Sequence, residues 1–290
     1  MKLGLGTVQF GLPYGISNKS GQVSAAEVNK ILLLAASSGI NVIDTAACYG
    51  NSESVLGANL PLVHDFSIVT KTLPLKTNKI GLEDVAKVEA GFYNSLHQLG
   101  QSSVHGLLIH HSADLLNPGG DYLYSALKRW KSEGLVKKIG VSVYDKEEVD
   151  RLFERYTFDI VQLPLNVFDQ RLVQDGTLQW LYQESVEIHV RSAFLQGLLL
   201  MPTTSLPPYF MNLKSHHAAY YKVLEQAEIS PLEGALGYLH NQPQISSVLI
   251  GVETSMQLQQ CLLAARNIPA LDFSSFAIDK SKILDPRNWR

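Results

Sequence analysis

Four side chains suited to acid catalysis on a carbonyl group stand at or just after apolar runs. Asp44 lies in the run NVIDT, Tyr49 follows it in a loop of small residues, and the runs FSIVTKT and VHGLLIH carry Lys71 and His110 near their ends. Burying an aspartate at the end of a strand costs free energy unless the carboxylate is paired. Because Lys71 can neutralise Asp44 from a neighbouring strand, the pattern indicates that the two belong to one site.

Together these residue types could donate a proton to a carbonyl oxygen. A free tyrosine has a pKa of about 10 and is a poor acid at neutral pH, whereas a nearby lysine cation lowers the pKa of a phenol. We therefore expect Lys71 to activate Tyr49, and Asp44 to hold Lys71 charged. His110 could donate a hydrogen bond to the carbonyl oxygen and orient the substrate. Such a site supplies no electrons, so hydride from a nicotinamide would complete the reaction.

Each of these residues also has an ordinary structural explanation. An aspartate at a strand end is commonly a turn or cap residue, a lysine there is commonly solvated, and single histidines and tyrosines often serve packing. What favours the catalytic interpretation is their placement at the same end of three consecutive strands, where catalytic groups gather in a parallel barrel.

The elements that would position these side chains alternate along the chain. Apolar runs predict eight strands, near residue 5 and at 41–45, 66–72, 104–110, 136–143, 158–165, 187–194 and 245–252. Their continuous apolar cores are typical of strands buried on both faces of a parallel sheet. The repeated β–α order predicts an α/β fold, a closed (β/α)8 TIM barrel, with a doubly wound open sheet as the alternative.

Helical patterns separate the strands. The first begins at Ser24, which has Glu27 at the spacing of a capping box, and closes at Gly39. The proline-rich stretch 198–214 and the tail from about residue 267 are expected to be loops at the mouth or an edge. Further helices are predicted at 82–100, 122–136, 146–156, 177–186, 216–228, 230–242 and 255–266.

Composition limits the class of protein. The 290 residues are 46% hydrophobic and carry a formal net charge of -3, which gives no electrostatic reason to bind nucleic acid or an anionic membrane. No run reaches the roughly 18 apolar residues of a membrane helix, and the glycine-rich start does not fit a signal peptide. Two cysteines, Cys48 and Cys261, make no disulfide framework. We expect a single domain over 1–290, in the cytoplasm, without a metal site.

Over nearly its whole length the sequence resembles the aldo-keto reductase family. The resemblance implies an eightfold barrel and reversible carbonyl reduction with a nicotinamide cofactor, usually NADPH, that lies across the strand ends. It also implies that Asp44, Tyr49, Lys71 and His110 are the catalytic tetrad, with His110 preferred to His111 because it ends the run LLIH. The matching segments are LGLGTVQFG, GINVIDTAACYGNSE, IVTK, LLIHH, KKIGVSVYD, DIVQLPLNVFDQR, VRSAFLQGLL, ISSVLIGVETSMQLQQ and DPRNW.

The resemblance further assigns residues to the cofactor. Ser142 and Gln162 match the family's contacts with the nicotinamide carboxamide, whereas Val143 replaces an asparagine. Arg191 stands where the family often stacks an aromatic ring on the nicotinamide; a guanidinium can also stack, or it can contact pyrophosphate. The other implied contacts are Gly4 and Thr7 near the nicotinamide, and Ser192, Leu195, Gln196 and Gly197 at the pyrophosphate.

The adenosine end departs from the family pattern. Members that use NADPH carry a lysine or arginine after strand eight, where this chain has Gly251, Val252, Glu253, Thr254, Gln257 and Cys261. Glu253 could repel a 2′-phosphate or accept hydrogen bonds from ribose hydroxyls, while main-chain amides at the helix start could still bind phosphate. The family favours NADPH as the cofactor, with NADH as the alternative, and Gly251, Glu253 and Gln257 as contacts.

Two other functions would suit the same fold. A non-catalytic sensor or scaffold would bind a nicotinamide without turnover, and a Schiff-base lyase would use Lys71 as its nucleophile. The main expectation is an oxidoreductase that reduces a small aldehyde or ketone, such as a sugar, and acts as a monomer or weak homo-oligomer. Tyr14, Cys48, His111, the 198–214 stretch and the tail would shape the substrate pocket.

Overall fold

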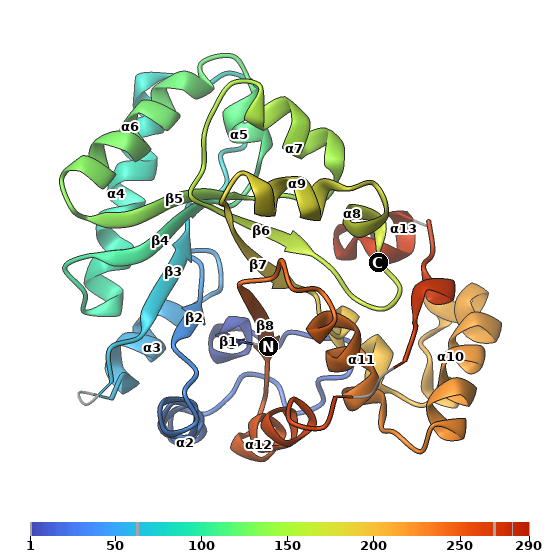
Figure 1. Cartoon of the computed structure of the whole chain (residues 1–290). Helices are drawn as coiled ribbons and strands as arrows, with labels where there is room; N and C mark the ends of the chain where they lie inside the picture. Colours follow the sequence, from blue (N-terminus) through green and yellow to red (C-terminus); the bar gives the residue numbers. More distant parts are fainter. Residues whose placement is uncertain (1, 62–63, 269–270, 280, 290) are drawn as a thin grey trace.

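Eight parallel strands close into a barrel in chain order (Figure 1). The computed structural model describes residues 2–61, 64–268, 271–279 and 281–289. Each strand pairs with the next one in the sequence, and β8 returns to pair with β1. This confirms the predicted (β/α)8 barrel and excludes the open sheet. The strands are β1 (Leu3–Gly6), β2 (Val42–Asp44), β3 (Ser67–Lys71), β4 (Val104–Ile109), β5 (Val136–Ser142), β6 (Ile160–Pro164), β7 (Glu187–Arg191) and β8 (Ser247–Gly251).

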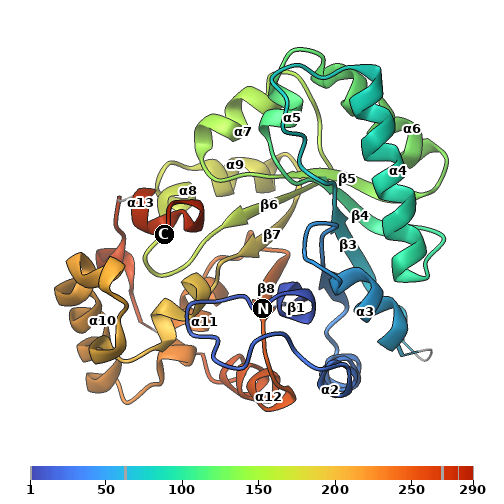
Figure 2. The ribbon, with the colours of Figure 1, turned by 180° about the vertical axis from the view of Figure 1, so that it is seen from behind.

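Helices surround the barrel on its outside (Figures 1 and 2). No helix of the described residues has both the length and the apolar character needed to cross a membrane. The α-helices are α1 (Val8–Gly11), α2 (Ala25–Ser37), α3 (Ser52–Asn59), α4 (Leu82–Leu99), α5 (Ala113–Leu116), α6 (Gly120–Ser132), α7 (Lys146–Phe153), α8 (Arg171–Gln174), α9 (Thr177–Gln183), α10 (Lys214–Gln226), α11 (Pro231–His240), α12 (Ser255–Ala264) and α13 (Ser281–Leu284). The 3-10 helices are η1 (Leu195–Leu200), η2 (Thr203–Ser205), η3 (Pro208–Leu213), η4 (Ser274–Phe276) and η5 (Pro286–Asn288).

The elements differ from their predicted bounds in several places. The first strand ends at Gly6, because the amide and the hydroxyl of Thr7 both donate to the Asp44 carbonyl at 3.0 Å and the chain then turns into α1. The stretch 198–214 is not simply a loop, since it contains η2 and η3, and the tail contains η4, α13 and η5. Helix α3 has no predicted counterpart, because the face that it buries is largely polar.

The start of α2 is capped differently from the predicted capping box. Ser24 Oγ accepts the amide of Glu27 at 3.4 Å, as expected. The Glu27 carboxylate, however, accepts the amide and the hydroxyl of Ser255 at 2.7 Å each. Glu27 therefore joins the first long helix, α2, to α12, which follows the last strand.

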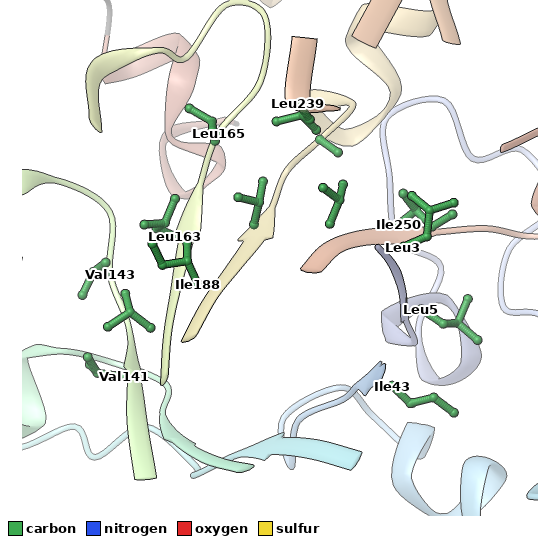
Figure 3. Close-up of a cluster of buried hydrophobic side chains, with 14 of the residues drawn as sticks. Leu3, Leu5, Ile43, Val141, Val143, Leu163, Leu165, Ile188, Leu239 and Ile250 are labelled. Carbon is green, nitrogen blue, oxygen red and sulfur yellow. The ribbon is translucent and has the colours of Figure 1, made fainter. Parts of the chain in front are cut away.

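The main apolar core lies between the barrel and the helices. Outward-facing strand residues such as Ile43 and Ile188 are fully buried there (Figure 3). A second, separate cluster contains Val69, Leu108 and Ile160, and Val69 pairs in register with Asp44. Because both faces of the strands are covered, their sequences are continuous apolar runs. Burying one such side chain contributes about 1.5–3 kcal/mol, so Ile188→Ala would be strongly destabilising.

Candidate active site

The carboxylate of Asp44 is buried at the carboxyl end of β2. Asp44 pairs in register with Val69 of β3, so Lys71, two residues further along β3, points to the same side of the sheet. Lys71 Nζ lies 2.6 Å from Asp44 Oδ2 and donates to the Thr45 carbonyl at 2.8 Å. The side chains of Lys71 and Asp44 are only 1% and 6% exposed. The Lys71 cation thus offsets the free-energy cost of burying the Asp44 carboxylate, and this is the pairing that the sequence predicts.

Gln162 of β6 holds the other oxygen of Asp44. Its side-chain amide nitrogen donates to Asp44 Oδ1 at 2.6 Å, and the residue is almost fully buried. Both carboxylate oxygens therefore have a partner, one a cation and one a neutral amide. The resemblance assigns Gln162 to the nicotinamide carboxamide. In the structure Gln162 does line the cavity, but its amide nitrogen has this other partner.

Tyr49 belongs to the loop between β2 and α3, which packs closely against α1. Gly11 permits this packing, because a Cβ at that position would collide with the carbonyl oxygen of Tyr49. Tyr49 Oη lies 3.5 Å from Lys71 Nζ, and Nζ lies 5.0 Å from the centroid of the Tyr49 ring. The phenol therefore ends beside the buried ion pair.

The pKa of Tyr49 differs from the expectation. Burial, followed by the charge of Asp44, raises the pKa of the Tyr49 hydroxyl well above its ordinary value of about 10. The expected net lowering of this pKa is not found, because burial and the charge of Asp44, which lies 2.6 Å from Lys71, act in the opposite direction. Burial also lowers the pKa of Lys71, and the contact with Asp44 opposes that shift. Tyr49 is consequently a neutral phenol around neutral pH.

His110 follows β4 directly and contacts Tyr49 edge-to-face, with 5.9 Å between the ring centroids. Burial, and after it the charges of Lys71 and Arg191, lower the pKa of His110 to about 3, so the imidazole is neutral. Its Nδ1 lies 3.3 Å from Cys48 Sγ. Partial burial raises the pKa of Cys48, which keeps the thiol protonated. The thiol can then donate to Nδ1, which leaves the imidazole proton on Nε2.

These side chains adjoin a cavity of about 660 Å³ at the carboxyl ends of the strands. Lys71 does not reach its wall, whereas Tyr14 and Cys48 do, as the sequence predicts. Within the described ranges, no group of three or more His, Cys, Asp or Glu residues is arranged to bind a metal ion. The predicted site residues that line the cavity are Thr7, Asp44, Tyr49, His110, Ser142, Gln162, Arg191, Ser192, Gln196, Gly197, Gly251, Glu253 and Gln257.

Besides Lys71, three predicted residues do not line the cavity. A Cβ at Gly4 would meet side chains of β8 at 2.6 and 2.8 Å, so this glycine serves the packing of β1, and Gly6 lines the cavity instead. Leu195 is fully buried in the apolar core. His111 is 46% exposed and pairs with an aspartate at 3.5 Å, so the expectation that it shapes the pocket is wrong.

Tyr144 lines the cavity, although the sequence does not predict it there. The guanidinium carbons of Arg191 and Arg287 lie 4.0 and 3.6 Å from the centroid of its ring. Arg191 also donates to the Val143 carbonyl at 3.0 Å, which holds it against the wall. The side chain of Val143 is itself buried in the outer core (Figure 3).

The available signal for Tyr144 was an aromatic residue two positions after Ser142. Its contact with Arg287, however, joins segments far apart in the sequence, which spacing does not predict. The other missed residues of the wall are Gly6, Val8, Gln9, Leu12, Gly15, Ser17, Ala193, Phe194, Leu232, Leu249 and Gln260. Leu200 and Pro286 also line the wall and belong to the 198–214 stretch and the tail, which the sequence predicts at the pocket.

The loop after β7 holds an unusual backbone at the cavity wall. Ser192, Leu195 and Gln196 have positive φ angles of 61°, 48° and 54°. Such a conformation costs a residue other than glycine about 1–3 kcal/mol, and it persists only where the surroundings enforce it. One such constraint is the Gln196 carbonyl, which accepts the Ile16 amide at 3.2 Å. Backbone strain concentrated beside a cavity supports a functional role for this loop.

Residues 2–282 match the family model of the Aldo/keto reductase family. The chain belongs to this family. Aldo/keto reductases are, as a family, oxidoreductases. The match covers every strand of the barrel.

Two curated relatives are similar to the chain over part of their length. An aldo-keto reductase of Mycolicibacterium vanbaalenii is 31% identical over 132 residues, 45% of either chain. A D-galacturonate reductase of Hypocrea jecorina is 30% identical over 157 residues, 47% of this chain and 50% of that protein. The chain thus spans about half the length of the curated relatives that it matches.

Solved aldo/keto structures share the fold along most of the chain. The holo form of an aldo-keto reductase from Bacillus halodurans has a TM-score of 0.76 at 17% identity, and the match covers 99% of this chain and 95% of that one. A glycerol dehydrogenase from Gluconobacter oxydans has a TM-score of 0.70 at 19% identity, with 98% and 92% covered.

Proposed function

We propose that this chain reduces an aldehyde or ketone to the alcohol with a nicotinamide cofactor, and that Tyr49 is the general acid. One observation carries the proposal. The Tyr49 hydroxyl, the buried Asp44–Lys71 pair and the neutral His110 converge beside one cavity. This combination suits proton donation to a carbonyl oxygen better than it suits any structural purpose.

The cavity wall has the chemistry to hold such a cofactor. The volume of the cavity falls within the range of about 300–1,000 Å³ that is usual for ligand sites. The wall combines hydroxyl and amide side chains with glycines, where main chain can approach a ligand closely. When bound, the cofactor supplies hydride. The nicotinamide half would be held by Ser142, Gln162 and Arg191, the pyrophosphate by Ser192, Gln196 and Gly197, and the adenosine by Gly251, Glu253 and Gln257.

Tyr49 would deliver the proton from Oη to the substrate oxygen. Burial raises the pKa of Tyr49, so the phenol is protonated but is a weak acid. Its weakness does not prevent the transfer, because the alkoxide that forms as the carbonyl is reduced is a much stronger base than a phenolate. Lys71 Nζ, 3.5 Å from Oη, would then stabilise the phenolate, and Asp44 keeps Lys71 in place.

His110 would orient the substrate and polarise its carbonyl. A neutral imidazole with its proton on Nε2 donates one hydrogen bond without carrying a charge into the site. The hydrogen bond strengthens as negative charge develops on the carbonyl oxygen, so it favours the transition state over the ground state.

The alternative functions have less support. A Schiff-base lyase needs a lysine that reaches its substrate, whereas Lys71 is 1% exposed, is bound to Asp44 and Thr45, and does not line the cavity. Borohydride trapping with a carbonyl ligand would give an adduct on Lys71 only if the lyase were correct. The sensor alternative shares the cavity and differs only in turnover.

Tyr49→Phe tests the reductase mechanism. The purified chain is assayed with NADPH and NADH against short aldehydes, aromatic aldehydes, aldoses and uronates, the last because one relative is a D-galacturonate reductase. We expect Tyr49→Phe to lower kcat by at least ~100-fold while the cofactor Kd, from tryptophan fluorescence, changes less than about twofold.

Tyr93→Phe, at an exposed tyrosine on α4, is the matched control and should keep full turnover. Full turnover by Tyr49→Phe would exclude the proposed acid. Cofactor binding by the unchanged chain without turnover of any carbonyl would favour the sensor.

A further inference from the structure

Glu253 and Gln257 border the cavity at the amino end of α12, and several amides of this segment are already bonded inside the protein. Glu253 N donates to Gln257 Oε1 at 2.6 Å, and Gln257 N donates to Thr254 Oγ1 at 3.1 Å. The amide and hydroxyl of Ser255 both donate to Glu27 Oε1 at 2.7 Å. A phosphate bound at this helix start would need such amides to be free.

Negative charge also lies at this end of the cavity and at the adjoining start of α12. Glu253 lines the cavity, and no described residue donates a hydrogen bond to its carboxylate or pairs with it. Hydrogen bonds from Ser255, the backbone one first, lower the pKa of Glu27 to about 2, so Glu27 is ionised at neutral pH. Lys30 lies 3.1 Å from Glu27, but its side chain is 66% exposed and its charge is screened. Among the described cavity-lining residues the one permanent cation is Arg191, which is held at the end of β7.

The two nicotinamide cofactors differ at this position. NADPH places a phosphate of about -2 charge on the adenosine ribose, whereas NADH has a hydroxyl that can donate to a carboxylate. We propose that this chain selects NADH over NADPH. Glu253 would accept hydrogen bonds from the ribose hydroxyls, and the Glu27 carboxylate would take the place of a bound phosphate at the amino end of α12. The inference rests on the proposed function, and it reverses the NADPH choice that the family resemblance favours.

Binding of NADPH through main-chain amides would disturb the protein more than binding of NADH. The side chains of Gln257 and Glu27 would have to release their amides, and the ionised Glu27 at the amino end of α12 would oppose the added phosphate charge. NADH requires neither change, so only NADPH binding bears the free-energy cost of breaking these bonds and of the charge repulsion. Specificity commonly uses such a repulsive element together with an attractive one.

Isothermal titration of the full chain tests this choice without any assay of turnover. The ligands are NADH and NADPH, and the fragment pair AMP and 2′,5′-ADP, which differ only in the 2′-phosphate. We expect NADH to bind at least tenfold more tightly than NADPH, and AMP to bind more tightly than 2′,5′-ADP. The fragments isolate the adenosine end from any effect at the nicotinamide.

Three variants assign the preference to residues. Glu253→Gln and Glu27→Gln each remove one negative charge. Each should lower the ratio of the NADPH Kd to the NADH Kd severalfold, and the double variant should lower this ratio further. Glu147→Gln is the matched control, because Glu147 is an 81% exposed glutamate on α7, and it should leave the ratio unchanged.

Each outcome is decisive. Equal or tighter binding of NADPH by the unchanged chain overturns the inference and leaves the proposed reductase intact. Binding of neither dinucleotide overturns the proposed function itself. An NADH preference that both carboxylate variants leave unchanged overturns the assignment to Glu27 and Glu253.

Discussion

At the scale of single residues, the protonation of the site follows from burial. The Tyr49 phenol and the His110 imidazole are both driven toward their neutral forms, because neither has an uncompensated charge of opposite sign beside it. Lys71, whose Nζ lies 3.5 Å from the Tyr49 hydroxyl, is shared with Asp44. Before the reaction begins, the Tyr49 phenol therefore already carries the proton to be donated, and the His110 imidazole carries one proton for a hydrogen bond.

This arrangement predicts opposite pH profiles for the two directions of the reaction. Reduction needs protonated Tyr49, whose pKa lies well above about 10, so kcat/KM for a carbonyl should stay flat from pH 6 to 9. Oxidation of the alcohol needs the phenolate and should rise about tenfold per pH unit over the same range. His110, with a pKa of about 3, should add no inflection near pH 6.5. Initial rates across this range check the prediction, and a fall in the reductive rate between pH 7 and 9 would contradict it.

A second prediction concerns the thiol that contacts His110. Cys48→Ala removes the 3.3 Å contact with Nδ1, so both neutral tautomers of His110 become populated. We expect kcat to fall roughly threefold to tenfold, the value of one neutral hydrogen bond. Cys48→Ser, whose hydroxyl can also donate, should restore it. Nitrogen-15 NMR of labelled histidine reads the tautomer directly, and an unchanged His110 spectrum in Cys48→Ala would sink the idea.

How far the sequence predicts single residues depends on the range of the contact. Asp44, Tyr49, Lys71 and His110 are predictable because parallel strand ends meet at one face. The bond from Gln162 to Asp44 and the raised pKa of Tyr49 are not, because they depend on side-chain directions and on burial that spacing does not encode.

At the scale of elements, Glu27 links α2 to α12. Its carboxylate accepts both the amide and the hydroxyl of Ser255, which holds the start of α12 in position. The sequence predicts both helices but not this link. The spacing of Ser24 and Glu27 is that of a local capping box, and the actual partner lies 228 residues away. Local patterns thus predict the helices better than the contacts between them.

The link predicts a pH-dependent contribution to stability. The folded pKa of Glu27, about 2, lies below its ordinary value, so the stabilisation is present above about pH 4.5 and is lost as the pH falls toward 2. Glu27→Gln should therefore lower Tm at pH 7, and the difference from the unchanged chain should shrink below about pH 4.5. Thermal unfolding followed by circular dichroism measures this, with Glu147→Gln as the control. A difference that is constant down to pH 3 would mean that the charge of Glu27 contributes nothing.

At the scale of the whole molecule, the cavity is completed by the last part of the chain. Tyr209 Oη lies 2.8 Å from the Lys282 carbonyl, and the Trp289 ring packs on Phe210 with 4.8 Å between the centroids. Pro286 lines the cavity, and Arg287 stacks on Tyr144. The expectation of a tail near the mouth is correct in location, yet its helical turns and its stacking partner depend on the closed barrel.

Arg287→Ala tests whether this terminal segment forms part of the substrate site. The change removes the guanidinium from the Tyr144 ring and leaves Asp285, its ion-pair partner, without that cation, so the segment should hold the cavity wall less firmly. We expect KM for the carbonyl substrate to rise roughly fivefold, the effect of about 1 kcal/mol from a lost cation–π contact, while kcat falls less.

The cofactor Kd should stay within about twofold, because the proposed cofactor contacts lie on β5 to β8, the loop after β7 and α12. Arg287→Lys serves as the matched variant: a lysine keeps the charge but cannot stack a planar guanidinium on the ring. If the KM depends on stacking, Arg287→Lys should behave like Arg287→Ala, whereas recovery by lysine would show that charge alone is needed. Steady-state kinetics with saturating cofactor decide between them, and an unchanged KM in both variants would place the terminal segment outside the substrate site.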